Sequence, residues 1–216
     1  MRGAVCNSGA MSVHIRPARP EDAADAVPLI YSSGPAVLDY IFTSRTQSDV
    51  AACMRRGFER DAGELGYRIH SVAVVDGRMA GIGAAFSGDT TLRFMYQGTR
   101  NVLACYGPLR GAGVIRRALQ VETIVRPPKS HEFCIAHLGV SPVLRSKGIG
   151  AQIVQHLLAD GRRRGFRVAV LDVSAENPRA QALYERLGFV VTRECISTLH
   201  NAHATVPNHR RMELTL

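Results

Sequence analysis

The residues best suited to chemistry lie in the turn Arg145-Ser-Lys-Gly148-Ile-Gly150. Its glycines carry no Cβ, so an incoming group can approach the backbone closely. Arg145 and Lys147 add positive charge, and a stretch with apolar residues at helical spacing follows from Ile149 onward. The N–H groups at a helix start are unpaired, and the helix dipole places partial positive charge there. The turn is therefore suited to a phosphate or pyrophosphate.

This turn matches neither of two common nucleotide-binding motifs. It lacks the Gly-x-x-x-x-Gly-Lys-Ser/Thr string of the P-loop and the three-glycine spacing of the dinucleotide-binding fold. A lone Gly-x-Gly is also compatible with a plain loop. The distinguishing feature is Arg-x-x-Gly-x-Gly placed after an apolar strand, which spans Ile135 to Val140 and is stopped by Pro142.

A second segment with chemical potential runs from Asn177 to Phe189, as Asn-Pro-x-Ala-x-x-x-Tyr-x-x-x-Gly-Phe. Asn177 can cap a helix whose first position is a proline, and Gly188 ends that helix. Tyr184 lies seven residues after Asn177, so two helical turns bring both onto one face. A phenol can donate a proton to a leaving group. The alternative for Tyr184 is a half-buried core residue whose hydroxyl is satisfied.

Together these segments resemble the acetyl-CoA-binding motifs of the GNAT N-acetyltransferases. The resemblance covers roughly Val13 to Leu216, but only Leu138–Leu158 and Asn177–Phe189 carry specific motif content. It implies that the turn holds the pyrophosphate of acetyl-CoA, that the strand binds the pantetheine and the carbonyl, and that Tyr184 protonates the departing thiolate. The binding residues that it implies are Leu138, Gly139, Val140, Arg145, Ser146, Lys147, Gly148, Ile149, Gly150, Asn177 and Tyr184.

The resemblance further implies direct transfer of an acetyl group to a primary amine of a small molecule or peptide. The amine must lose a proton, because an alkylamine has a pKa of about 10. Our first candidate for the base is Glu132, then His137, then a chain of waters, and Glu122 could also reach in. Glu132 could instead be a solvated strand-edge charge, and His137 a packed polar residue. The acceptor itself stays unidentified.

The amino-acid composition bears on whether the protein could instead bind nucleic acid, bind a metal or span a membrane. The net charge of +9 invites nucleic-acid binding, but basic residues cluster only at Arg162–Arg164 and His209–Arg211, and the phosphates of CoA also require positive potential. A non-catalytic acyl-CoA sensor remains an alternative. The five cysteines form no CxxC pair, so we expect reduced thiols and no metal site. The sequence shows neither a membrane span nor a secretory signal, so we expect a cytoplasmic protein, with a homodimer left open.

The element pattern predicts a single α/β domain over 13–216, preceded by a flexible N-terminal extension over 1–12. We expect a mixed, mostly antiparallel central sheet flanked by helices. An Asp-Gly pair at 76–77 predicts a β-hairpin between apolar runs 69–75 and 79–86. A helical insert over about 88–129, broken near Gly107-Pro108, separates strands three and four. We expect this insert to cap the acceptor site, form a dimer contact or merely extend the scaffold.

Overall fold

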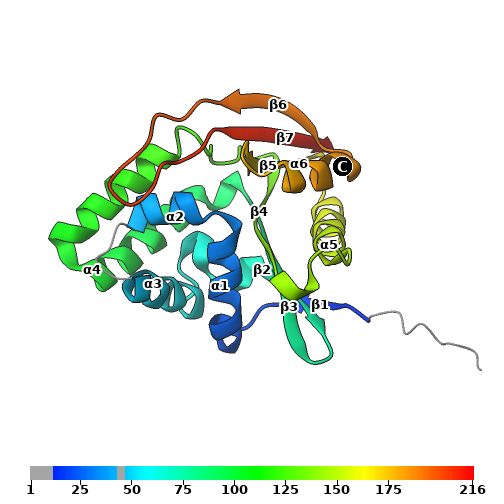
Figure 1. The fold of residues 1–216 in the computed structure, drawn as a ribbon, viewed down its shortest axis with the longest axis horizontal. Helices are drawn as coiled ribbons and strands as arrows, with labels where there is room; N and C mark the ends of the chain where they lie inside the picture. The colour runs from blue at the N-terminus through cyan, green and yellow to red at the C-terminus, as the bar shows by residue number, and fades with distance from the viewer. Residues whose placement is uncertain (1–11, 43–46) are drawn as a thin grey trace, which may run out of the picture.

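A computed structural model of the protein describes residues 12–42 and 47–216. The predicted N-terminal extension of residues 1–12 lies almost wholly outside these described residues. Figure 1 shows a central sheet with α5 on one side and α1 to α4 gathered on the other. No helix in the described ranges combines the length and apolarity needed to cross a membrane.

The sheet has the strand order β1-β2-β3-β4-β5-β7-β6. Only the β4–β5 pair is parallel, and every other neighbouring pair is antiparallel, which confirms the predicted mixed, mostly antiparallel sheet. The strands are β1 (His14–Pro17), β2 (His70–Val75), β3 (Arg78–Ser87), β4 (Glu132–Val140), β5 (Val168–Ser174), β6 (Val190–Cys195) and β7 (His209–Thr215).

The helices follow the predicted order. They are α1 (Ala23–Ser33), α2 (Pro35–Phe42), α3 (Gln47–Glu59), α4 (Thr91–Val121), α5 (Ile149–Arg163) and α6 (Pro178–Arg186). The predicted hairpin is confirmed, because Asp76 and Gly77 adopt φ angles of 49° and 75° and join β2 to β3 in a two-residue turn. The insert holds α4, which is interrupted at Gly107 with φ 70° and ψ 175°, immediately before Pro108. The predicted break in the insert is therefore confirmed.

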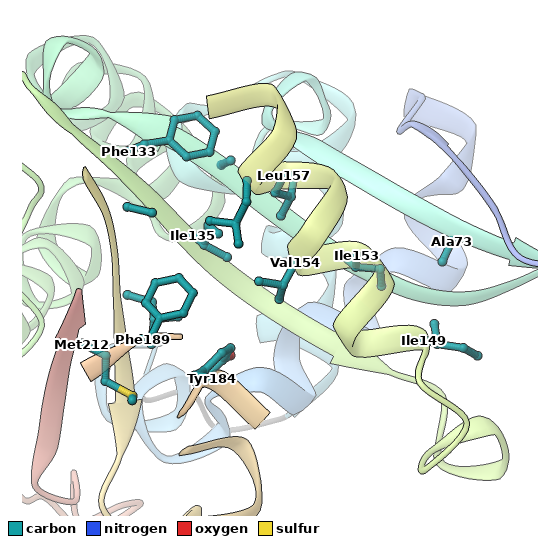
Figure 2. Close-up of a cluster of buried hydrophobic side chains, with 14 of the residues drawn as sticks. Ala73, Phe133, Ile135, Ile149, Ile153, Val154, Leu157, Tyr184, Phe189 and Met212 are labelled. Carbon is teal, nitrogen blue, oxygen red and sulfur yellow. The ribbon is translucent and has the colours of Figure 1, made fainter. Parts of the chain in front are cut away.

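Two apolar cores hold the layers together. On one face α5 places Ile149, Ile153 and Leu157 against the sheet, as Figure 2 shows. A Cβ built on Gly83 of β3 would lie 2.7 Å from the Ile153 side chain, so only glycine lets α5 approach this closely. The opposite face packs against α1 and α3, with Phe58 fully buried.

The feature that creates the cleft is the separation of β4 from β5. These strands pair only from Glu132–Cys134 to Val168–Val170 and then diverge. In β4 a bulge also interrupts the pairing with β3, because Ile82 faces Gly139 while Ala84 faces Ala136. Two residues of β4 therefore oppose one of β3, and His137 in the bulge has a φ of 54°. Backbone groups on the β5 side of β4 are left without a neighbouring strand.

Candidate active site

A cleft of about 1030 Å³ opens where β4 and β5 separate. Its walls come from the second half of β4, the end of β5, the first turn of α5, helix α6 and the corner between α1 and α2. Of the predicted site residues, the cleft is lined by His137, Leu138, Gly139, Val140, Arg145, Ser146, Gly148, Ile149, Gly150, Asn177 and Tyr184. One fold feature thus brings together two motifs that are separated in the sequence.

The turn before α5 presents unpaired amide groups to the cleft. Ser146 and Gly148 have φ angles of 66° and 81°, which turn the chain sharply into the helix. Within α5, the first amide that donates to a backbone carbonyl is that of Gln152, which bonds to the Gly148 carbonyl. The four amides from Gly148 to Ala151 donate to no backbone carbonyl in the described part of the chain. A Cβ built on Gly148 meets no atom within 4 Å, so the space beside these amides is open. These features fit a pyrophosphate.

Two arginines flank this turn. The Arg145 Nε donates to the Val140 carbonyl at 3.2 Å, and an Arg179 guanidinium nitrogen donates to the Ser146 hydroxyl at 2.8 Å. The sequence reasoning missed Arg179, although its place two residues after the helix-capping asparagine put it near any anion held there. Lys147 is exposed and does not line the cleft, so the structure does not bring this predicted residue into it.

Asn177 begins α6 as predicted. Its side-chain Oδ1 accepts a hydrogen bond from the Ala180 amide at 3.0 Å, which caps the helix. This bond fixes the side chain at the mouth of the cleft and leaves the amide nitrogen Nδ2 to donate elsewhere. The cap therefore explains why the helix starts here and how Asn177 is oriented beside the turn.

Tyr184 lies deeper, with 8% of its surface exposed. Its ring packs edge-on against Phe189, with ring centroids 6.0 Å apart, and Figure 2 shows both rings close to Met212. The hydroxyl makes no hydrogen bond with any residue in the described ranges, while the residue lines the cleft. Burial raises the pKa of Tyr184, so the phenol keeps its proton at neutral pH. Such a group can donate that proton to an anion formed in the cleft.

The structure does not place Glu132 at the cleft. Glu132 is buried at the start of β4, where its carboxylate pairs with Arg211 at 2.9 Å and accepts from the Lys129 amide. Burial alone would raise its pKa, but the Lys129 amide and the charge of Arg211 outweigh burial and lower it. This carboxylate is paired with Arg211 and lies outside the cleft, so it cannot reach an amine bound there, and our first candidate is corrected. The alternative of a solvated strand-edge charge is also wrong, because the side chain is buried.

Arg211 also joins a second carboxylate that the sequence reasoning missed. Its guanidinium lies 2.7 Å from Asp172, whose side chain is 6% exposed and which lines the cleft. Burial raises the pKa of Asp172 even though Arg211 opposes this effect. The ion pair links β5 to β7 just beyond Val170, the last residue of β5 that pairs with β4. A carboxylate paired in this way has a structural role in the wall of the cleft.

His137 is the base candidate that the structure does bring to the cleft. Its bulge position turns the imidazole toward β2, where its Nδ1 lies 3.1 Å from the Nε2 of His70. Desolvation lowers the pKa of His137 to about 4, so the ring is neutral at physiological pH. This pairing could not be predicted from the sequence, because the two histidines are 67 residues apart.

Glu122 and Glu64 lie outside the cleft lining. Glu122 follows the last turn of α4, and burial raises its pKa. The predicted reach of Glu122 into the site is therefore not seen. No group of three or more metal-ligating side chains occurs in the part of the chain that the structure describes.

Comparisons with known proteins agree with this geometry. The sequence model of the acetyltransferase (GNAT) family matches residues 40–189. The 5-NmdU N-acetyltransferase of Pseudomonas phage PaMx11 is 32% identical over 84 residues, which is 39% of this chain and 56% of that protein. The ribosomal protein bS18-alanine N-acetyltransferase of Escherichia coli K12 is 36% identical over 58 residues, covering 27% of this chain and 39% of that enzyme. Each match spans less than two thirds of the relative.

Solved structures share the whole fold. An N-acetyltransferase from Staphylococcus aureus Mu50 superposes with a TM-score of 0.69 at 19% identity, over 93% of this chain and all of that one. The ribosomal-protein-S18-alanine N-acetyltransferase from Escherichia coli gives a TM-score of 0.56 at 16% identity, with 94% of each chain covered. The family match, the divergent strands and the glycine turn lead to one conclusion, which is that this chain belongs to the GNAT family of acetyltransferases.

Proposed function

We propose that this protein is an acetyl-CoA-dependent N-acetyltransferase that moves an acetyl group directly to a primary amine of a small molecule or peptide. One observation carries the proposal: a single cleft joins the unpaired amides before α5 to the free hydroxyl of Tyr184. The first suits the anionic end of a CoA thioester, and the second suits its sulfur. Membership of the GNAT family supports the same reading, because acetyl-CoA is the usual donor in that family.

Different residues of the cleft would bind different parts of acetyl-CoA. The turn Arg145–Gly150, with Arg179 beside it, would hold the pyrophosphate through amide groups and positive charge. The free edge of β4 at Leu138–Val140 would hydrogen-bond the pantetheine as a neighbouring strand would. Asn177 would donate from its Nδ2. When bound, acetyl-CoA supplies an acetyl group activated as a thioester.

Tyr184 is the proposed acid. Its hydroxyl would give its proton to the sulfur as the carbon–sulfur bond breaks, and solvent would replace that proton. The raised pKa keeps the phenol protonated until the thiolate forms. Its packing against Phe189 holds the ring in place, so little freedom is lost when the donor binds.

The test is a panel of amines assayed with acetyl-CoA, with release of free thiol as the first readout and mass of the acetylated amine as the second. The panel includes 5-NmdU and an alanine-containing peptide of ribosomal protein bS18, because related enzymes are named for these acceptors. The proposal predicts thiol release that depends on one class of amine. Binding of acetyl-CoA without any transfer would favour the sensor instead. Binding of nucleic acid with a steep salt dependence would favour the basic module.

We further propose that the protein is cytoplasmic and forms a homodimer through α4. This helix exposes large apolar side chains, among them Leu92 at 81% and Leu109 at 92% exposure. Large apolar side chains exposed along one helix favour an interaction surface there. Light scattering would then give twice the mass of one chain, and Leu109→Asp would give the mass of a single chain.

A further inference from the structure

Two histidines from different strands lie edge to edge beside the cleft. His70 begins β2 and is 2% exposed, whereas His137 occupies the bulge of β4 and lines the cleft. The ring centroids are 5.3 Å apart and the ring planes are 12° from parallel, so the two rings lie side by side in nearly the same plane. The residue pairing of His70 with Ala84, and of Ala84 with Ala136, puts both histidines on the face that packs against α1 and α3. Only a bulge brings His137 to this place.

The hydrogen bonds around His70 fix the protonation of both rings. The Nδ1 of His70 lies 2.7 Å from the Gly66 carbonyl, and a carbonyl can only accept. The Nδ1 of His70 must therefore carry a hydrogen. Burial lowers the pKa of His70 to about 3, so its ring is neutral and its Nε2 is an acceptor. The Nδ1 of His137, 3.1 Å away, must then be the donor to that Nε2.

These hydrogen bonds leave the Nε2 of His137 without a hydrogen. The Nδ1 of His137 carries the hydrogen of the neutral ring, so its Nε2 has a free lone pair. That Nε2 makes no hydrogen bond with any residue of the described ranges. The residue lines the same cleft as Tyr184. A lone pair is thus held available beside the place where the amine would approach.

We propose that His70 is a positioning residue that holds His137 in its Nδ1–H form, so that the Nε2 of His137 accepts the proton of the acceptor amine. The inference rests on the proposed function, because it assigns the base of that same reaction. In the step, the amine nitrogen bonds to the carbonyl carbon and the carbon–sulfur bond breaks. The nitrogen gives its proton to the Nε2 of His137, and the sulfur receives one from Tyr184. Solvent carries the balance of one proton from the imidazolium to the tyrosinate.

Burial of His137 suits its role as the base. Desolvation keeps His137 in its basic form at all pH values near neutrality, so no activity is lost to its protonation. A weak base cannot strip a free ammonium ion efficiently. It can take the proton of a nitrogen that has begun to bond to the carbonyl carbon, because that proton is far more acidic. We therefore expect the amine to bind in its neutral form.

The direct test is the tautomer of His137, read from ¹⁵N chemical shifts of histidine-labelled protein, which distinguish a protonated ring nitrogen from a bare one. The wild-type chain should show a protonated Nδ1 and a bare Nε2 at His137. The variant His70→Leu removes the acceptor and should give a mixture of tautomers. The variant His70→Gln offers a side-chain carbonyl in place of Nε2 and should restore the wild-type form. A protonated Nε2 in the wild-type chain would overturn the inference.

Kinetics supply the second readout. His137→Ala should lower kcat by about 100-fold or more, as expected for loss of a general base. His70→Leu should lower kcat by about 10- to 100-fold, the range typical of residues that orient a functional imidazole, with an unchanged KM for acetyl-CoA. His70→Gln should recover most of that loss. A merely structural His70 would instead lower the melting temperature and change KM and kcat together, without rescue, and that pattern would overturn its positioning role.

The two proposals fail in different ways. If the wild-type chain transfers acetyl groups but His137→Ala keeps full kcat, only the assignment of the base is overturned. If the wild-type chain transfers acetyl groups to no amine of the panel, the proposed function fails and the proton step fails with it. The tautomer measured in the same chain then still decides whether His70 holds His137 in the Nδ1–H form.

Discussion

At the scale of single residues, Tyr184 combines a core role with a chemical one. Its ring belongs to the apolar cluster beneath α6, where it meets Phe189, while its hydroxyl lies at the cleft. Packing therefore fixes the direction of the hydroxyl, and burial raises the pKa of the phenol so that it stays protonated. A side chain placed in this way can be tested by removing one oxygen atom, because the apolar contacts of the ring remain.

Tyr184→Phe should lower kcat by about 100- to 10,000-fold, the range that a general acid supplies, while the KM for acetyl-CoA changes little. Steady-state thiol release measures both constants. The matched control is Tyr106→Phe on α4, which removes a hydroxyl outside the cleft lining and should leave both constants unchanged. An unchanged kcat in Tyr184→Phe would exclude the phenol as the acid.

Tyr106 carries a second prediction. Its hydroxyl is buried and is the one side-chain polar atom of the described residues found buried without a hydrogen-bond partner. A buried, unsatisfied hydroxyl costs free energy, so Tyr106→Phe should stabilise the folded chain by about 1 kcal/mol. Urea unfolding gives this difference in the free energy of unfolding. A destabilised variant would show that the hydroxyl has a partner, such as a bound water.

The histidine pair predicts how stability depends on pH. Burial lowers the pKa of His70 to about 3 and that of His137 to about 4, below the ordinary 6.5. Between pH 4 and pH 6.5 the unfolded chain binds protons that the folded chain does not bind. The free energy of unfolding is therefore highest above pH 6.5 and decreases as the pH falls toward 4. The free energy of unfolding from urea titrations should be lower at about pH 5 than at about pH 7.5. His137→Gln should flatten this dependence, and an unchanged slope would contradict it.

At the scale of elements, short sequence motifs predicted the turns and the helix cap that neighbouring residues determine. The Asp76-Gly77 hairpin, the turn Arg145–Gly150 and the cap at Asn177 are each set by residues within a few positions of one another, and all were predicted. The site also depends on pairings across the sheet. Arg211 meets Glu132 over a separation of 79 residues and so removes it as a base. The bulge that turns His137 toward His70 depends on the pairing of β3 with β4. The spacing of residues within one segment cannot predict contacts between segments that are distant in the sequence.

The position of α5 can be tested through its packing on the sheet. Ile153 is fully buried and touches the position of Gly83, so Ile153→Ala should lower the free energy of unfolding by about 2–5 kcal/mol. Chemical denaturation measures this loss. Val143→Ala, whose side chain is 81% exposed in the turn before α5, is the control and should change stability by less than about 0.5 kcal/mol. Equal effects of the two changes would contradict the packing of α5.

At the scale of the whole molecule, the fold separates two tasks. The face covered by α5 supplies an apolar core, and the divergence of β4 from β5 opens a cleft whose lining extends to the corner between α1 and α2. The end of α1 and the start of α2 also line this cleft. The shared fold does not identify the amine that would be accepted, so the acceptor must be found by experiment.

The most direct measurement is a calorimetric titration of the protein with acetyl-CoA, together with its melting temperature. We predict binding of one acetyl-CoA per chain, and at about 100 times Kd the ligand should stabilise the fold by about 2.7 kcal/mol. Gly150→Val should abolish binding, because a Cβ at this position already lies 3.4 Å from the Leu183 side chain and 3.6 Å from that of Val140, so the added methyl groups would crowd the wall of the cleft. Gly98→Val on α4, where a Cβ meets no atom within 4 Å, is the matched control and should bind normally. No binding by the wild-type chain, or undiminished binding by Gly150→Val, would contradict the account.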